Sequence, residues 1–157
     1  MGLTEEDAVK IGGVLKDIDF LKHLSPRETE ILIAGFEKTP MKAGDTLITQ
    51  GKSGAIFYII ASGIVGVFLK RQLMDKKVAT LVAGQYFGEM ALLDDEPRSA
   101  SVKCEKDGEV FTLLRDTFQT VIMHNLEIGR EITATAKKRK VDTHNIDLND
   151  SMQKKFR

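Results

Sequence analysis

The 157-residue sequence has a single cysteine, no excess of charge of either sign and no long run of apolar residues. One thiol, Cys104, cannot form a disulfide within the chain, which indicates a reducing environment. The longest near-apolar stretch, 55–69, contains Ser62, Gly63 and Gly66 and is shorter than the roughly 20 apolar residues of a membrane span. We therefore predict two buried strands in this stretch and no transmembrane helix.

The two signs of charge balance, with 23 basic and 23 acidic side chains, but they are unevenly distributed. Residues 1–125 contain 15 basic and 18 acidic side chains, and residues 126–157 contain 8 and 5. A mildly acidic body has no general attraction for nucleic acid, so we expect no nucleic-acid partner. Any anion that the chain binds must be held by local groups.

The first residues lack the pattern of a secretory signal. Glu5, Glu6 and Asp7 stand where a signal peptide has a basic stretch followed by an apolar core. Glu6 also stands where an N-myristoylation signal starting at Gly2 needs serine or threonine. We expect a cytoplasmic protein.

Capping signals predict a short helix over residues 26–34. Ser25 is a capping serine, proline follows at the first helical position, and Glu28 stands at the third. Gly35 is predicted to end this helix in a left-handed conformation. Further upstream, the glycine pair at 12–13 predicts a break between helical segments.

Between residues 36 and 115 the pattern changes to short apolar or alternating runs separated by glycine turns, which is typical of a barrel or jelly roll. The strands that we predict cover residues 36–40, 46–49, 56–61, 64–70, 78–82, 101–104 and 110–114. A helical turn at 88–93 interrupts them. Cys104 lies on a predicted strand, where we expect a small buried residue rather than a redox switch.

After the strands, Asp116 and Gln119 have the spacing of a second helix start. The predicted buried face of this helix has three apolar residues: Phe118, Val121 and Ile122. A further helix is predicted over 126–140, and residues 141–157 are expected to form a polar, flexible tail.

The stretch 86–102 contains the residues best suited to bind an anion. Residues 88–92 place successive backbone amides at the start of a short helix, which suits a phosphate oxygen. Pro97 stiffens the returning chain, and Arg98 then offers a bidentate cation. Glu89 can accept a hydrogen bond from a hydroxyl group beside the phosphate.

Other interpretations of these residues give no bound ligand. Glu89 could cap a purely structural helix while Arg98 pairs with the local acids Asp94, Asp95 and Glu96. Elsewhere, the run 51–53 resembles the end of a P-loop, but Thr46 stands where that motif needs glycine, so a hairpin turn is predicted. The three histidines, His23, His124 and His144, lack metal-ligand spacing. We therefore expect no metal, no cofactor and no catalytic residue.

The ordered pattern in 86–102 resembles the phosphate-binding cassette of the cyclic nucleotide-binding domain. The matching residues are Gly88, Glu89, Ala91, Leu92, Pro97, Arg98 and Ala100. The resemblance covers about residues 14–140 and includes domains of the eukaryotic cGMP- and cAMP-dependent protein kinases. It implies an α+β fold: an eight-stranded antiparallel β jelly roll with an inserted phosphate-binding helix, flanked by N-terminal helices and two C-terminal lid helices. The expected divisions are 1–35, the roll 36–115 with its cassette 86–102, the lid 116–140 and the tail 141–157.

The resemblance also implies roles for individual residues. Arg98 would bind the cyclic phosphate, Glu89 the ribose 2′-hydroxyl, and the amides of Gly88 and Ala91 the phosphate oxygens. The full predicted nucleotide site is Phe87, Gly88, Glu89, Met90, Ala91, Leu92, Pro97, Arg98, Ser99 and Ala100. The Ser99 hydroxyl slightly favours cGMP over cAMP. Candidate lid contacts to the base are Ile132, Lys137, Lys138 and Val141, although the basic run 137–140 is more often a solvated helix face.

These features together predict a regulatory sensor that binds cGMP or cAMP and performs no reaction. The resemblance implies that it is one domain of a cyclic nucleotide-dependent kinase or of a regulatory subunit, with a kinase or another effector domain as its partner. An alternative from a different class is a protein-interaction domain that keeps the fold without binding nucleotide.

Overall fold

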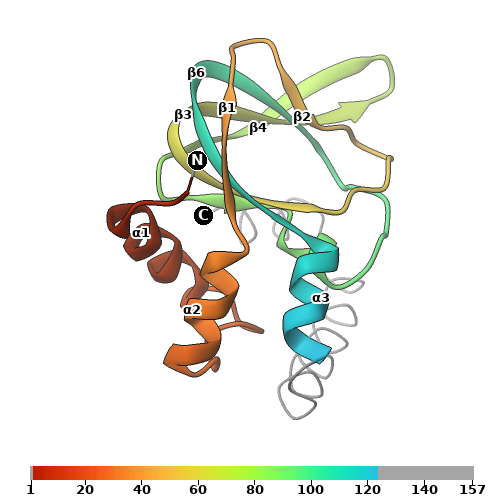
Figure 1. Cartoon of the computed structure of the whole chain (residues 1–157). Coiled ribbons are helices and arrows are strands. Elements are labelled where there is room, and N and C mark those ends of the chain that lie inside the picture. Colours follow the sequence, from red (N-terminus) through yellow and green to blue (C-terminus); the bar gives the residue numbers. More distant parts are fainter. Residues whose placement is uncertain (1, 124–157) are drawn as a thin grey trace.

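The computed structural model of the chain describes residues 2–123 (Figure 1). The elements, in chain order, are helices α1 (Glu5–Leu15) and α2 (Pro26–Ala34), strands β1 (Glu37–Met41), β2 (Thr46–Ile48), β3 (Ile56–Arg71), β4 (Met74–Val82) and β5 (Tyr86–Phe87), the 3-10 helix η1 (Glu89–Leu92), strand β6 (Ser101–Leu114) and helix α3 (Arg115–Met123). Predictions for residues 126–140 and 141–157 lie outside the described residues. None of the described helices is long and apolar enough to cross a bilayer.

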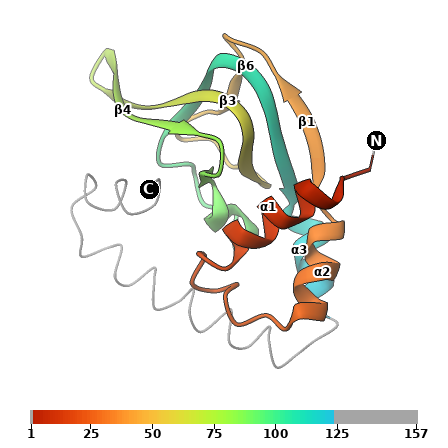
Figure 2. The same ribbon diagram turned by 90° about the vertical axis from the view of Figure 1, so that its left-hand side faces the viewer.

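The strands form one antiparallel sheet that curls into a roll, with the helices gathered at one end of it (Figures 1 and 2). Strands β1, β6, β3 and β4 are neighbours in that order, β2 pairs with β6, and β5 pairs with β3. The predicted α+β jelly roll is confirmed. Each of two predicted pairs of strands is one long, bent strand, β3 or β6, so the seven predicted strands become five. The short strand β5, which was not predicted, is the sixth in the described residues.

Glycines predicted as turns mark the places where these two long strands bend and cross. Strand β3 runs through Gly63, which has a φ of 91°, and its pairing with β6 shifts register there. A Cβ on Gly63 would lie 2.6 Å from the Lys106 carbonyl oxygen, and one on Gly108 would overlap the Ser62 backbone. The predicted breaks at 62–63 and 107–108 are therefore wrong, because glycine here permits close approach of two strands rather than a turn.

Helix α2 has the predicted bounds, with reciprocal capping bonds between Ser25 and Glu28 of 2.9 and 3.2 Å. The predicted break at 12–13 is wrong, since α1 continues through both glycines. A Cβ on Gly12 would stand 3.5 Å from Ile33 Cδ1, so α1 and α2 pack closely there. Burial of the apolar face of α1 outweighs the cost of about 1 kcal/mol for each helical glycine.

The core has two parts. One lies between the helices and the roll and centres on Phe57, whose ring meets those of Phe36 and Tyr86 edge-on at centroid distances of 6.0 and 5.9 Å. Phe118 of α3 is buried in the same part, as predicted, although the helix begins at Arg115 rather than after a cap at Asp116. The second part fills the roll. Among its buried members is Cys104, as predicted.

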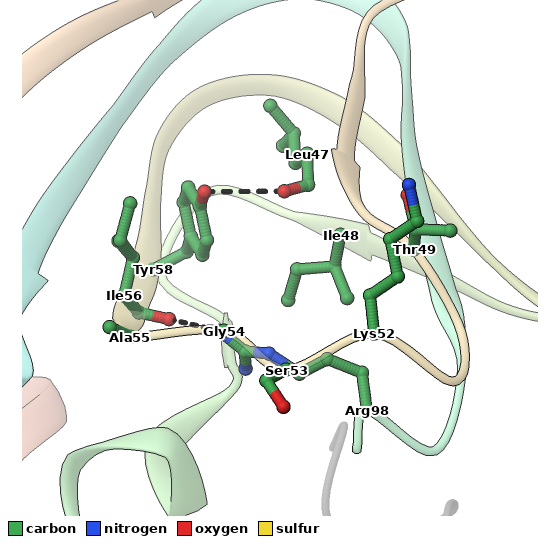
Figure 3. Close-up of a pocket in the computed structure, with 10 residues that line it drawn as sticks. All are labelled: Leu47, Ile48, Thr49, Lys52, Ser53, Gly54, Ala55, Ile56, Tyr58 and Arg98. Atoms are coloured by element: carbon green, nitrogen blue, oxygen red, sulfur yellow. Dashed lines mark hydrogen bonds between the residues drawn. The ribbon is translucent and has the colours of Figure 1, made fainter. Parts of the chain in front are cut away.

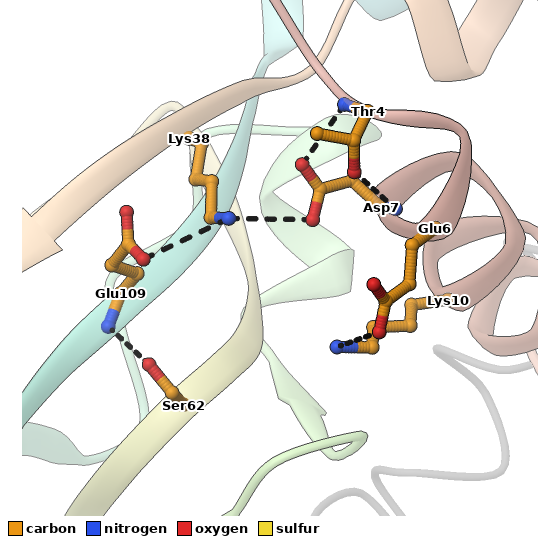
Figure 4. A network of polar contacts seen from close by, with 7 residues as sticks. All are labelled: Thr4, Glu6, Asp7, Lys10, Lys38, Ser62 and Glu109. Atoms are coloured by element: carbon orange, nitrogen blue, oxygen red, sulfur yellow. Dashed lines mark hydrogen bonds and ion pairs between the residues drawn. The ribbon is translucent and has the colours of Figure 1, made fainter.

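A polar network joins α1 to the strands (Figure 4). Thr4 and Asp7 exchange two capping bonds of 3.0 Å, and Lys38 Nζ lies 3.3 Å from Asp7 and 3.7 Å from Glu109. The Glu109 amide donates to Ser62 Oγ at 3.1 Å. The hydrogen bond from the Thr4 backbone lowers the pKa of the buried Asp7 carboxylate, against an opposing effect of burial. The network holds the N-terminal helix against the roll.

The predicted left-handed end of α2 is wrong. Gly35 is right-handed, with φ −82° and ψ −9°. A Cβ at this position would lie 2.7 Å from Thr117 Cγ2 on α3 and 3.4 Å from Leu113 Cδ1. Glycine is needed here because α3 approaches the end of α2 closely.

This contact predicts that Gly35→Ala lowers the free energy of unfolding by about 1 to 3 kcal/mol, as overpacking does. Thr117→Ser removes Cγ2, so the double variant should recover most of that loss. Urea unfolding of the two single variants and the double variant measures the coupling. If Gly35→Ala lowers the free energy of unfolding as much in the Thr117→Ser background as it does alone, the account is contradicted.

Candidate functional site

A cavity of about 210 Å³ lies between β2, the loop after it and the start of β3 (Figure 3). Its lining residues are Leu47, Ile48, Thr49, Lys52, Ser53, Gly54, Ala55, Ile56, Tyr58 and Arg98. Arg98 comes from the segment between η1 and β6. Of these ten residues, Lys52 and Arg98 are cationic and none is acidic, so the cavity is suited to an anion.

The Arg98 guanidinium is only partly engaged by the protein. Its Nη2 donates to the Ile56 carbonyl at 2.7 Å, and Nη1 makes a long contact of 3.5 Å with the Gly88 carbonyl. Its Nε is buried and has no hydrogen-bond partner within residues 2–123. These contacts are to carbonyl oxygens, so they do not support the alternative in which Arg98 pairs with the acids at 94–96. A guanidinium in this state retains a donor for an anion.

The pKa of Arg98 is lowered, chiefly because the side chain is partly buried. Among charged neighbours, Tyr58 and Glu89 raise this pKa and Arg115 lowers it. Arginine stays protonated in proteins, so the side chain remains a cation. Burial raises the pKa of Tyr58, because it disfavours the phenolate, and the nearby charge of Arg98 lowers it. An unpaired buried charge is costly. An anionic ligand here would provide the hydrogen-bond acceptors that Arg98 lacks within the described residues.

Two glycines leave room for the guanidinium. A Cβ on Gly54 would overlap Arg98 Nε and lie 2.6 Å from Nη2, and one on Gly88 would lie 2.5 Å from Nη1. Gly88 also has a left-handed backbone with a φ of 80°. Glycine at both positions is therefore a requirement of the arginine's position, and Gly88 additionally sets the start of η1.

The loop between β2 and β3 pairs with the cassette. The Gly51 amide donates to the Arg98 carbonyl and the Arg98 amide to the Lys52 carbonyl, both at 2.9 Å. Ser53 Oγ donates to the Asp95 carbonyl at 3.0 Å, and the Gln50 amide donates to Ser101 Oγ at 2.9 Å. The hairpin turn predicted for 51–53 is wrong, because β2 and β3 do not pair and the loop forms a wall of the cavity.

Of the ten predicted nucleotide-binding residues, Arg98 lines this cavity and the other nine do not. Five of the nine are buried: Phe87, Glu89, Ala91, Leu92 and Ala100. The remaining four are the half-buried Gly88, Met90 and Ser99 and the exposed Pro97. The Ala91 amide donates to the carbonyl of Gly88, the residue before η1, at 3.1 Å, so this predicted phosphate donor already has a partner. The lid candidates Ile132, Lys137, Lys138 and Val141 lie outside the described residues.

Arg115, which sequence reasoning missed, holds the site against α3. Its Nε donates to the Ala91 carbonyl and its Nη2 to the Gly54 carbonyl, each at 2.6 Å. The Arg115 amide also donates to the Ala55 carbonyl at 2.8 Å. The side chain of Arg115, the first residue of α3, thus connects η1 to the loop between β2 and β3. Its partners are backbone carbonyls, which have no signature in a sequence.

We predict that Arg115→Met lowers the free energy of unfolding by about 2 kcal/mol, since two charge-assisted bonds to carbonyls are lost. Arg27→Met, on the exposed first turn of α2, is the matched control and should change it by less than about 0.5 kcal/mol. Urea unfolding measures both. Equal stability of the two variants would show that the Arg115 contacts contribute nothing.

A family model described as "Cyclic nucleotide-binding domain" matches residues 38–125, more than half of the chain. The chain belongs to this family. Among curated relatives of the domain, a cAMP-dependent protein kinase regulatory subunit of Yarrowia lipolytica is 37% identical over 110 residues, covering 70% of this chain and 29% of that protein. A cGMP-dependent protein kinase of Plasmodium berghei is 36% identical over 117 residues, covering 74% and 13%.

Solved structures of similar fold agree with this assignment. The regulatory domain of Toxoplasma gondii PKA, in a co-crystal with cAMP, has a TM-score of 0.68 and 25% identity, covering 76% of this chain and 46% of that one. The catabolite activator protein of Thermus thermophilus has a TM-score of 0.62 and 28% identity, covering 80% and 59%. The chain spans less than a third of the length of the two curated relatives described above.

Proposed function

We propose that this domain binds a cyclic nucleotide with its phosphate against Arg98 and acts as a regulatory sensor, not as a catalyst. The observation that carries the proposal is the Arg98 side chain: a half-buried cation that lines the cavity, with Nε lacking a partner in the described part of the chain. The single negative charge and exocyclic oxygens of a cyclic phosphate match this donor set. The family match and the relatives named as cyclic nucleotide-dependent kinase proteins support the proposal.

Binding would work by competition for the guanidinium. The phosphate takes Nε and displaces the long contact between Nη1 and the Gly88 carbonyl, which frees the start of η1 to move. Arg115 transmits this movement, because it holds the Ala91 carbonyl of η1 at the first residue of α3. Ligand shifts the domain only by its differential affinity for the two arrangements. The roles of Glu89 towards the ribose and of the lid remain predictions.

The choice of nucleotide is a finer proposal. The relatives described above include both a cAMP-dependent and a cGMP-dependent protein. The prediction that the Ser99 hydroxyl favours cGMP stays a prediction, since Ser99 is half-buried and does not line the cavity. We infer that the parent is a cyclic nucleotide-dependent kinase or its regulatory subunit, with a kinase domain as the partner.

The proposal predicts that Arg98→Ala reduces the free energy of cyclic nucleotide binding by on the order of 2 to 5 kcal/mol. Arg98→Lys keeps the charge but loses the planar fork of donors, so its loss should be intermediate. The matched control is Arg27→Ala on α2, which should bind as the unaltered protein does. Calorimetric titration with cAMP and with cGMP measures all four proteins after circular dichroism has shown that they are folded.

Two outcomes would contradict the proposal. Unchanged affinity in Arg98→Ala would remove the assigned role of the arginine. Silence from both nucleotides, on folded protein freed of ligand, would favour the protein-interaction alternative. Thermal unfolding gives an independent check, because a ligand at a hundredfold excess over its Kd stabilises the native state by about 2.7 kcal/mol.

A further inference from the structure

The tip of the β3–β4 hairpin, residues 70–77, is a surface that the proposed nucleotide site does not use. Figure 2 shows the hairpin projecting from the roll on the side away from α1, α2 and α3. All eight residues of the hairpin tip are exposed, and two of them are large and apolar. Leu73 is 95% exposed and Met74 is 75% exposed. Adjacent apolar side chains on a protruding tip mark a contact surface.

The turn itself gives no reason for these apolar residues. Arg71 pairs with Met74, so Gln72 and Leu73 form a two-residue loop, and Gln72 has a φ of 58°. A left-handed first residue in such a loop favours Gly, Asn or Asp, and the side chains of both loop residues face water. A leucine in the loop neither eases the turn nor packs on the roll.

Basic side chains surround the apolar pair. The hairpin tip has four cations, Lys70, Arg71, Lys76 and Lys77, and a single acid, Asp75. Lys77 pairs with Glu105 at 2.7 Å, and Asp75 is held by Lys103 at 3.5 Å. Lys70 and Lys76 take part in none of the ion pairs found within residues 2–123. The hairpin tip is therefore a local excess of positive charge around two apolar side chains.

We propose that the hairpin tip docks on the surface of an anionic lipid bilayer. Leu73 and Met74 enter the boundary between headgroups and acyl chains, while Lys70 and Lys76 contact lipid phosphates and carboxylates. Weak apolar insertion and weak charge attraction are each insufficient alone, and the hairpin tip combines them. The mildly acidic body does not oppose docking, because charges are screened over roughly 8 Å at physiological ionic strength and the hairpin extends away from the body.

The shape of the hairpin tip favours a bilayer over other anionic partners. A nucleic acid offers phosphates but no apolar medium for Leu73. An acidic protein surface would need a shaped pocket for two side chains at the end of a convex hairpin, whereas a bilayer needs none. The first residue of the hairpin tip is tied to the loop that precedes the cavity residues Lys52 and Ser53, since the Lys70 amide donates to Gln50 Oε1 at 2.8 Å. Docking would hold the helical end of the domain away from the membrane.

Sedimentation of the full chain with large vesicles tests the proposal. We expect binding to phosphatidylcholine vesicles that contain phosphatidylserine and little binding to phosphatidylcholine alone, with the difference shrinking at high salt. Lys70→Gln with Lys76→Gln should weaken binding on the order of tenfold. Leu73→Ser with Met74→Ser should weaken it several-fold. The matched controls are Val9→Ser, a 75% exposed apolar residue on α1, and Lys42→Gln, an exposed lysine after β1.

Equal sedimentation with both kinds of vesicle, or none with either, would overturn the proposal. Loss of binding in the controls to the same degree would overturn it as well, because non-specific charge would then explain the attraction. Unchanged binding in the hairpin variants would assign the contact to another basic segment, such as 137–140. Binding to polyglutamate or RNA in place of vesicles would identify a different partner. None of these results depends on nucleotide, so they leave the proposed sensor function untouched.

Discussion

The candidate site depends on holding one half-buried arginine charge at the wall of a cavity in the β-roll. Burying a guanidinium without partners is costly, and within residues 2–123 the five donors of Arg98 have two carbonyl contacts, to Ile56 and Gly88. Gly54 and Gly88 are the residues that let the side chain lie where it does, since a Cβ at either would collide with it. At the cavity that Arg98 lines, the described part of the chain therefore solvates a cation incompletely, and this is the basis on which we propose an anionic ligand there.

The loop between β2 and β3 contacts both Arg98 and Arg115. The Gly54 carbonyl accepts a hydrogen bond from Arg115, and the Arg98 guanidinium occupies the position that a Cβ on Gly54 would take. Arg115 is the first residue of α3 and donates to the Ala91 carbonyl of η1. The two arginines therefore connect the loop before β3, η1 and α3. Burial lowers the pKa of Arg98, the like charge of Arg115 lowers it further, and the two cations together favour an anion. In the proposed function, a ligand at Arg98 would act where these contacts join the roll to its helices, which is the position that a sensor requires.

Much of this arrangement could be predicted from the sequence, and most of the wrong predictions concern glycine. Capping residues located α2, and alternating runs separated by glycines indicated the roll. The order of the residues at 88–100 predicted Arg98 as the anion ligand; the structure places Arg98 at the wall of the cavity, and its role stays a prediction. Glycine was the source of error, because it serves turns, left-handed ends and close contacts alike. Gly35 and Gly63 permit close packing, and the choice among these uses is decided by tertiary neighbours. Arg115 was missed for a related reason, since it bonds to backbone carbonyls that any residue supplies.

The most direct measurement follows the Nε–Hε group of Arg98 by nuclear magnetic resonance in protein labelled with ¹⁵N-arginine, with the Arg98→Lys variant assigning the signal. In the ligand-free protein this group is buried without a hydrogen-bond partner within the described residues. The account predicts that saturating cAMP or cGMP shifts its proton signal downfield and slows its exchange with water, because a phosphate oxygen becomes its acceptor. An unchanged Arg98 signal in protein that calorimetry shows to be saturated with nucleotide would contradict the central claim.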